Sequence, residues 1–278
     1  MNPATGTGIG KLERLTNEVS NERSGSISDD GRILAYASDR DGTSGFWVRD
    51  LKTGTNRKLH TVDGGFVAAP AVSPDGALVA YTDADISAVV VTSRGAFVAR
   101  VPDMGAIAWK NNRELIVGMA NAPGALETSV RIFDVLTKSI SRANINSDPS
   151  CSWMAGYAIN YCEEPQENGS LKLSLAKPDS RPPFHFLGYF RNEPFIFSTT
   201  KGDFCYWFGQ HEGRDSVYGV RLNPSTAAPV GKPFVAYEFP ANVRVAGGPR
   251  NNPEIRNHSV VVTLTERNSN IWIEHPLN

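Results

Sequence analysis

The chain has 278 residues, a formal net charge of −1, 40% hydrophobic residues and 21% charged residues. This composition is ordinary for a globular protein and argues against extended disorder. The near-zero charge excludes a general basic field that would hold a nucleic-acid backbone. No apolar run approaches the ~20 residues that cross a bilayer. We therefore expect no nucleic-acid partner and no membrane span.

The first ten residues are small and polar, without the charged and apolar regions of a signal peptide. The chain as given is therefore predicted to be cytoplasmic. If a signal or an upstream membrane-anchored domain has been removed, the prediction becomes periplasmic or extracellular. We expect a monomer.

Residues 26–59 contain three short apolar runs separated by two turn clusters. Asp29-Asp30-Gly31 predicts a tight turn, because Asp favours the first turn positions and Gly accepts a positive φ. The apolar run at 33–37 and the aromatic, β-branched run at 46–48 then read as strands. Strand and turn alternate at the spacing of an antiparallel meander.

The meander recurs along the chain. Residues 72–81 overlay residues 27–36 almost position by position, and a weaker copy covers 197–206. Degenerate copies begin near residues 106, 150 and 253. A period of about forty residues with four strands per unit indicates the blades of a β-propeller.

We predict one all-β domain over residues 1–278, a six-bladed β-propeller of four-stranded antiparallel blades with almost no helix. The predicted blades are about residues 22–60, 67–102, 105–145, 150–190, 193–240 and 252–275, with 11–17 added to the last. The last blade has only three strands of its own. The N-terminal strand at 12–16 is therefore predicted to pair antiparallel with 259–265 or 270–274 and close the ring. Residues 223–232 are predicted to be an insert, and 241–253 a long loop.

The unit Val72-Ser73-Pro74-Asp75-Gly76, with its apolar continuation, resembles the TolB-like propeller repeat. The first copy of the unit, at 27–36, is followed by Ser-Asp-Arg-Asp-Gly at 38–42 and an aromatic strand, which carry the same resemblance. The repeat also occurs in propeller domains of dipeptidyl-peptidase type. The chain's C-terminal pattern looks like that of bacterial sensor-type propellers. The resemblance covers essentially the whole chain and implies a six-bladed ring with a binding role, and no particular catalytic activity.

Local motifs for chemistry are weak. Residues 42–45 lack the spacing of a Gly-x-Ser-x-Gly nucleophile turn, which argues against a serine hydrolase. The Asp-rich turns at 39–42 and 83–85 resemble calcium loops faintly, but they are read as carboxylates capping their own backbone. The three cysteines are read as idle thiols, with a Cys151–Cys162 disulfide left open as an alternative, and no zinc pattern is present. We expect no cofactor, no metal and no catalytic residue.

Inner strands line the central channel of a propeller, so residues near them are the candidate ligand-binding set. Three glutamates from different blades are placed to converge near one channel mouth, where carboxylates can do acid–base work. The candidates are Glu22, Arg23, Trp109, Trp153, Glu193, Asn252 and Glu254.

Two functions fit this pattern. We favour a non-catalytic binding or sensor propeller that holds a protein, peptide or small-molecule ligand at the channel mouth or on one face. The alternative is an enzyme, a hydrolase or lyase, that uses convergent carboxylates in the central pocket.

Overall fold

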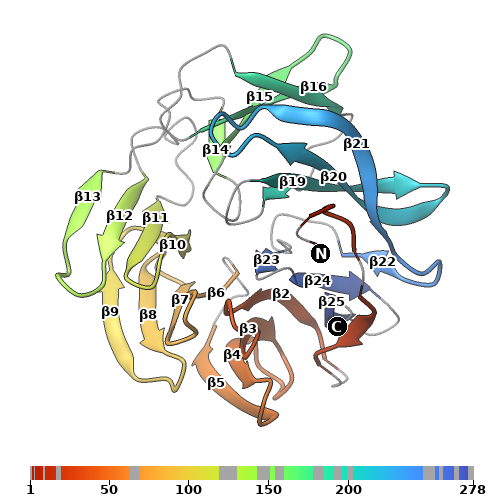
Figure 1. Ribbon diagram of the computed structural model, residues 1–278. Helices are drawn as coiled ribbons and strands as arrows, with labels where there is room; N and C mark the ends of the chain where they lie inside the picture. The colour runs from red at the N-terminus through yellow and green to blue at the C-terminus, as the bar shows by residue number, and fades with distance from the viewer. Residues whose placement is uncertain are drawn as a thin grey trace. The chain divides into compact units, whose positions relative to one another are not determined.

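The chain is all-β in the residues that its computed structural model describes, which contain strands and turns but no helix (Figure 1). None of these residues forms a helix that is long and apolar enough to cross a membrane. The structure describes residues 2, 4–8, 10–16, 20–62, 69–118, 130–142, 151–153, 160–177, 184–190, 196–198, 203–246, 254–256, 259–265 and 269–274.

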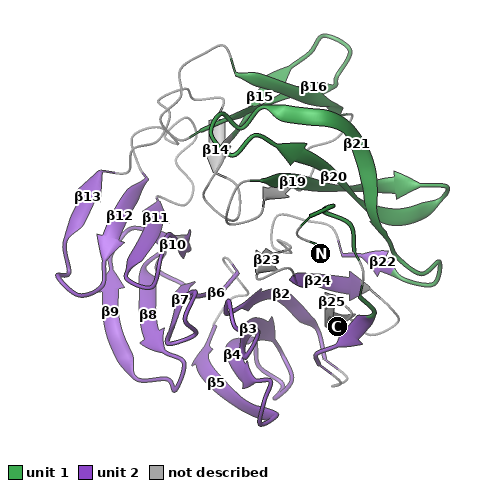
Figure 2. Cartoon of the chain, viewed as in Figure 1, with its two compact units in different colours: residues 1–11, 144–243, 275–278 green, residues 12–143, 244–274 purple. Residues whose placement is uncertain are grey.

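The chain divides into two compact units (Figure 2). Unit 2 comprises residues 12–143 and 244–274, and unit 1 comprises residues 1–11, 144–243 and 275–278. Each unit is therefore assembled from separate stretches of sequence.

Unit 2 contains three four-stranded antiparallel sheets whose strands pair in chain order. The first holds β2 (Glu22–Ile27), β3 (Ile33–Ser38), β4 (Gly45–Asp50) and β5 (Thr55–Thr61). The second holds β6 (Ala71–Val72), β7 (Leu78–Thr82), β8 (Ala88–Thr92) and β9 (Phe97–Val101). The third holds β10 (Gly105–Trp109), β11 (Glu114–Gly118), β12 (Arg131–Asp134) and β13 (Ile140–Arg142). Contacts run from β2 to β6 and from β6 to β10, while β5, β9 and β13 lie at the outside (Figure 1).

The remaining sheet of unit 2 joins the two ends of that unit's sequence. Its order is β1 (Leu12–Arg14), β25 (Ser269–Glu274), β24 (Ser259–Thr265) and β22 (Arg244–Val245), and β23 (Glu254–Arg256) also pairs with β24. The predicted antiparallel pairing of the N-terminal strand is present, with Leu12 opposite Glu274 and Arg14 opposite Trp272. The prediction of a plain loop at 241–253 is wrong at its start, because β22 pairs with Leu264 and Thr265.

Unit 1 contains two further four-stranded antiparallel sheets. One holds β14 (Cys151–Trp153), β15 (Asn160–Pro165), β16 (Leu171–Ala176) and β17 (His185–Phe190). The other holds β18 (Ile196–Ser198), β19 (Phe204–His211), β20 (Arg214–Leu222) and β21 (Pro229–Glu238). The predicted insert at 223–232 is shorter than expected, because β21 begins at Pro229.

Apolar side chains on both faces of β7 hold it to the sheets on either side in unit 2. Val79 and Tyr81 of β7 pack with Ala35, Phe46 and other residues of the first sheet. Ala80, between them in sequence, packs with Trp109 and Leu115 of the third sheet. This is the two-residue period of a strand that is buried on both sides. All-β content, small antiparallel sheets in a meander and face-to-face packing together make the chain a β-propeller.

The repeated turn keeps the same hydrogen bonds in its two best copies. Ser28 Oγ donates to Asp30 Oδ1 (2.5 Å) and accepts from the Ile33 amide (2.9 Å). Ser73 Oγ donates to Asp75 Oδ1 (2.6 Å) and accepts from the Leu78 amide (2.9 Å). The serine and aspartate side chains thereby replace ladder bonds that the turning backbone cannot make.

Candidate functional site

Strand β2 is tied to the sheets on both of its sides. The Ser24 amide donates to Thr263 Oγ1 of β24 (3.2 Å), and Ser26 Oγ accepts from the Val72 amide of β6 (3.0 Å). Between Arg23 and Ser26 the pairing with β3 shifts by a bulge, and Ser24 has a φ of 58°. Bulges and left-handed non-glycine residues cluster at sites where a side chain is re-aimed. The first residues of β2 are therefore a candidate site.

Glu22, the first residue of β2, is completely buried. Ser20 Oγ donates to its Oε1 at 3.4 Å. Ser38, which lies opposite Glu22 on β3, donates through its Oγ to Ser20 Oγ at 3.5 Å. Glu22 and Asp83 are the two buried carboxylates among the residues that the structure describes. A buried carboxylate is costly to retain, so its position is a candidate for chemistry.

Asp39 and Arg23 lie at the same strand ends as Glu22. The Asn21 amide and Asn21 Nδ2 each donate to Asp39 at 2.8 Å. Partial burial acts to raise the pKa of Asp39, but the hydrogen bonds from Asn21 and the nearby charge of Arg23 outweigh it and lower that pKa. Asp39 therefore remains ionised beside a half-buried guanidinium.

The other predicted ligand-binding residues have different surroundings. Trp109 is 1% exposed, packs in the core between the second and third sheets, and donates through Nε1 to the Ala71 carbonyl (2.9 Å). Trp153 lies on β14, and Glu254 begins β23, which contacts β2. Glu193 and Asn252 lie outside the described residues. The structure thus places Glu22, Arg23 and the strand of Glu254 next to one another.

A second carboxylate pair follows the end of β7 and was read from the sequence only as turn capping. Arg100 of β9 forms ion pairs with Asp83 (2.8 Å) and with Asp85. Burial, followed by the hydrogen bond with Asp85, raises the pKa of Asp83. The hydrogen bond from Asp83, followed by that from Arg100, lowers the pKa of Asp85. The alternation of Asp83 and Asp85 is a signal in the sequence, but Arg100 lies fifteen residues further on, and only the folded sheet brings it there.

Metal ligands and thiols are sparse in the described part of the chain. No group of three or more His, Cys, Asp or Glu side chains there is arranged to hold a metal ion. Cys162 is disulfide-bonded, and Cys151 lies opposite it in the strand register. The reading of Cys162 as an idle thiol is therefore wrong, and the disulfide that was left open as an alternative fits this register. Cys205 is a free, buried thiol whose pKa is raised by that burial.

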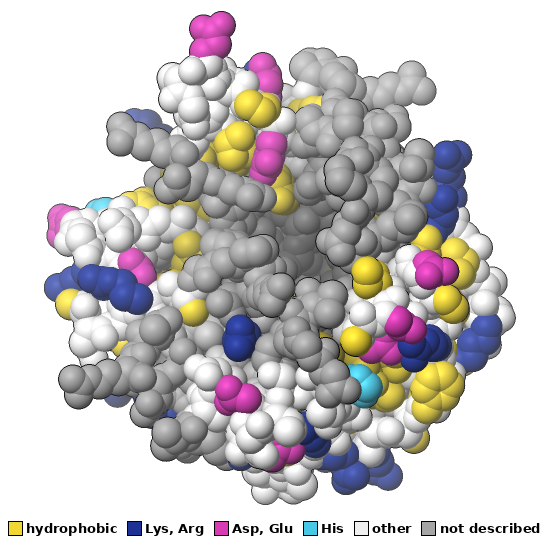
Figure 3. Space-filling view, turned by 180° about the vertical axis from the view of Figure 1, so that it is seen from behind, with side chains coloured by type: hydrophobic (Ala, Val, Ile, Leu, Met, Phe, Trp, Pro, Cys, Tyr) yellow, Lys and Arg dark blue, Asp and Glu magenta, His cyan; other side chains and the backbone are white. Residues whose placement is uncertain are grey.

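Charged side chains are interspersed on the surface. On the face shown in Figure 3, Lys and Arg lie beside Asp and Glu rather than forming a field of one sign. Ion pairs between exposed and partly buried side chains also occur, such as Arg32–Asp50 (2.7 Å) and Arg113–Asp134 (2.5 Å). The surface is consistent with the near-zero net charge.

No protein-family model matches the sequence, and no curated protein does. Solved structures of β-propeller proteins resemble the fold. An oligogalacturonate lyase in complex with manganese has a TM-score of 0.61 at 13% identity, over 97% of this chain and 94% of that one. The oligogalacturonate lyase of Vibrio parahaemolyticus gives 0.50 at 11% identity, over 96% and 95%. The β-propeller domain of the Trilobed protease from Pyrococcus furiosus gives 0.50 at 14% identity, over 93% and 83%. An acylaminoacyl peptidase gives 0.52 at 13% identity, but only 44% of that chain is matched.

These likenesses correct the favoured functional prediction. A non-catalytic binding or sensor propeller was expected, but lyases and peptidases are among the structures that resemble the chain. The prediction that leaned against an enzyme is corrected by the same finding. The physical reason is that a propeller draws its side chains from several blades, so a catalytic set leaves no local sequence motif.

Proposed function

We propose that the chain is an enzyme of the lyase class that cleaves an acidic oligosaccharide by elimination. The observation that carries the proposal is the likeness to oligogalacturonate lyase, which extends over 97% of this chain and 94% of that one. The likeness to the acylaminoacyl peptidase leaves more than half of that chain unmatched. The lyase is therefore matched over nearly its whole length and the peptidase over less than half, which is why we propose a lyase.

The proposal includes a six-bladed ring in one domain. The five sheets with strands in chain order are five of the blades, and the sheet of β1, β25, β24, β22 and β23 is the sixth. In this arrangement β1 is the outermost strand of that blade. β22 and β23 together replace its innermost strand, because both pair with β24 on the edge that faces away from β25.

The proposed chemistry uses Glu22 and Arg23. In an elimination, a base takes the proton from the carbon next to the sugar carboxylate. The electron pair of that carbon–hydrogen bond forms a carbon–carbon double bond, the bond from the neighbouring carbon to the glycosidic oxygen breaks, and the oxygen leaves with its own electron pair and takes a proton from the protonated base. We assign the base to Glu22, and binding of the substrate carboxylate to Arg23, whose charge offsets the negative charge that develops. Because Glu22 is enclosed, this end of β2 must open to admit the substrate.

One of the similar lyase structures is a complex with manganese, which raises the question of a metal in this chain. The described residues do not contain a set of side chains that fits a metal ion. No step of the proposed reaction is therefore assigned to a metal.

The test is an assay of the full chain on oligogalacturonides, with ultraviolet absorbance for the unsaturated product and a reducing-end assay for total cleavage. Elimination gives both signals in equal amounts. Reducing ends without the unsaturated product would show hydrolysis instead of elimination and would contradict the lyase assignment. The absence of both signals would overturn the proposal that the chain is an enzyme for this substrate.

A matched pair of variants tests the assignment of the base. We expect Glu22→Gln to lower kcat by at least about a hundredfold, which is a typical contribution of general acid–base catalysis. Glu167→Gln, at an exposed turn residue, should leave kcat unchanged. Equal activities of the two variants would remove Glu22 from the mechanism.

A further inference from the structure

A cavity of about 350 Å³ lies between the first two sheets of unit 2, at the strand ends opposite to Glu22. The turns β2–β3 and β4–β5 form one wall, and the turns β6–β7 and β8–β9 form the other. Arg32, Arg57 and Arg94 line it, and we name it the arginine pocket. Its volume is in the range of small-molecule sites.

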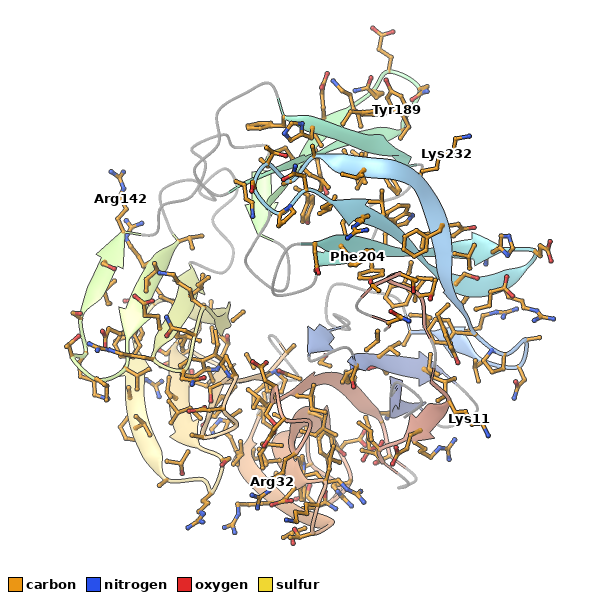
Figure 4. All side chains as sticks on the ribbon, viewed as in Figure 1. Lys11, Arg32, Arg142, Tyr189, Phe204 and Lys232 are labelled. Carbon is orange, nitrogen blue, oxygen red and sulfur yellow. The ribbon has the colours of Figure 1, made fainter. Side chains whose placement is uncertain are left out.

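One of the three arginines is engaged within the protein. Arg32, labelled in Figure 4, donates to Asp50 Oδ2 through Nε (3.0 Å) and Nη2 (2.7 Å). Asp50 also accepts from the amides of Lys52 and Thr53 at 3.0 and 3.1 Å. Arg32 and Asp50 therefore satisfy each other and form a fixed part of the pocket wall.

The two other carboxylates of the pocket are partly engaged. Asp30 Oδ1 accepts from Ser28 Oγ and from the Arg32 amide (3.0 Å). Asp75 Oδ1 accepts from Ser73 Oγ and from the Ala77 amide (3.1 Å). In each side chain these bonds go to Oδ1, so each carboxylate keeps further acceptor capacity, and both residues line the pocket.

The side chains of Arg57 and Arg94 form no hydrogen bond or ion pair within the part of the chain that the structure describes, although the Arg57 backbone pairs with β4. Both line the pocket, and Gly95, the residue after Arg94, lies near Arg57, because a Cβ built on it would be 3.8 Å from Arg57 Cδ. Both residues are exposed to solvent and line the cavity, where a guanidinium group is a good donor for a carboxylate. The pocket therefore has cationic donors from Arg57 and Arg94 and carboxylate acceptors from Asp30 and Asp75.

We propose that the arginine pocket is a binding site for a small hydroxylated carboxylate, a hydroxy acid or an acidic monosaccharide. The ligand's carboxylate pairs with Arg57 and Arg94, and its hydroxyl groups donate to Asp30 and Asp75. A ligand that is negative throughout would be repelled by those two aspartates, and a neutral sugar would leave the arginines unpaired. The site goes beyond the proposed lyase reaction and does not depend on it.

The test is equilibrium binding by titration calorimetry on the full chain, with D-galacturonate as the probe and D-galactose and inorganic phosphate as comparisons. We expect saturable galacturonate binding that weakens with added salt, at least about tenfold tighter than binding of galactose or phosphate. Equally tight binding of galactose would show that the pocket does not recognise the carboxylate of the ligand. Equally tight binding of phosphate would show that the pocket does not recognise the hydroxyl groups of the sugar. Either result overturns the proposal.

Variants locate the binding. Arg57→Gln with Arg94→Gln should weaken galacturonate binding at least about tenfold, and Ala77→Phe, which places a large side chain in the cavity lining, should do the same. Arg142→Gln, at an exposed position on β13 (Figure 4), is the matched control and should bind as the parent does. Arg23→Gln should also retain the pocket's binding.

Two outcomes would overturn the arginine pocket. Binding lost in Arg23→Gln but kept in the Arg57 and Arg94 variant would favour the proposed active site instead. No saturable binding by the parent would remove the pocket and leave the lyase assay to be judged alone.

Discussion

At the scale of single residues, the repeated turn has the same conformation in both copies but different surroundings. Gly31 and Gly76 both have a φ of 72°, as the sequence predicted for equivalent hairpins. A Cβ on Gly31 would meet nothing within 4 Å. A Cβ on Gly76 would lie 2.9 Å from Ile33 Cγ1, on the neighbouring sheet.

The two glycines should therefore differ in their response to the same substitution. Gly31→Val should lower the free energy of unfolding by about 1–2 kcal/mol, the cost of a left-handed β-branched residue. Gly76→Val should cost about 1–3 kcal/mol more, because it also overpacks the contact with Ile33. Urea denaturation of both variants measures the difference. Equal urea midpoints for the two variants would show that Ile33 moves away from the new side chain at residue 76 without a cost in stability.

Asp41 provides a test by pH. Lys58 Nζ lies 2.7 Å from its Oδ2, and Thr43 Oγ1 donates to its Oδ1 at 2.9 Å. The hydrogen bond from Lys58 is the main cause that lowers the pKa of Asp41 from 3.8 to about 2. Because the folded-state pKa is lowered, the ionised carboxylate stabilises the fold above the unfolded value, and this contribution is lost as the pH falls to about 2.

Asp41→Asn should accordingly be less stable than the parent at about pH 5, and this gap should close as the pH approaches about 2. The measurement is the urea midpoint of both proteins across that range. A gap that stays constant with pH would mean that the carboxylate's charge contributes nothing.

At the scale of elements, β1 connects the two sequence segments of unit 2. Leu15, just after β1, is 5% exposed and packs with Ile27, Leu34 and Val261. Leu12 is only half-buried. Leu15 is therefore the leucine of this segment that packs inward.

Leu15→Ala should lower the free energy of unfolding by about 2–4 kcal/mol, because it leaves a cavity between two sheets. Leu12→Ala is the matched control and should cost clearly less. Thermal and urea denaturation of the two variants decide the question. A larger loss for Leu12→Ala would mean that β1 is held by its strand pairing and not by this packing.

The sequence predicted regular elements well and irregular ones poorly. The turn at Asp75-Gly76 and the strands around it follow from local propensity, so they were placed correctly. β22 was missed because two residues are too few to show the alternating pattern of a strand. They form a strand only through their partners on β24. Arg57 and Arg94 were also missed as a site, because the sequence does not show which distant residues come together. They lie on different sheets, and only packing brings them to one pocket.

At the scale of the whole molecule, unit 2 is discontinuous in sequence. Residues 12–143 carry β2, whose neighbours β24 and β25 come from residues 244–274. Ile27, Leu34 and Tyr36 are completely buried, partly under Val261 of that second segment. The first segment by itself would expose this apolar face to water.

A fragment of residues 12–143 should therefore bind a hydrophobic dye and melt well below the same fragment joined by a flexible linker to residues 244–274. Dye fluorescence and thermal melts of the two proteins test this expectation. Equal melting temperatures would show that the first three sheets need no cover from β24 and β25.

The same discontinuity has a consequence for the time course of folding. During synthesis the strands β2–β5 leave the ribosome long before β24 and β25, because most of the intervening sequence has to be made first. At roughly 5–20 residues per second, the face around Ile27 waits on the order of ten seconds or more for Val261. Pairing between strands so far apart in sequence is also intrinsically slow, because the loop must close before the contacts form. The nascent chain should consequently depend on a holding chaperone over this interval, and a slow final phase of refolding should coincide with the docking of β24 and β25 onto β2.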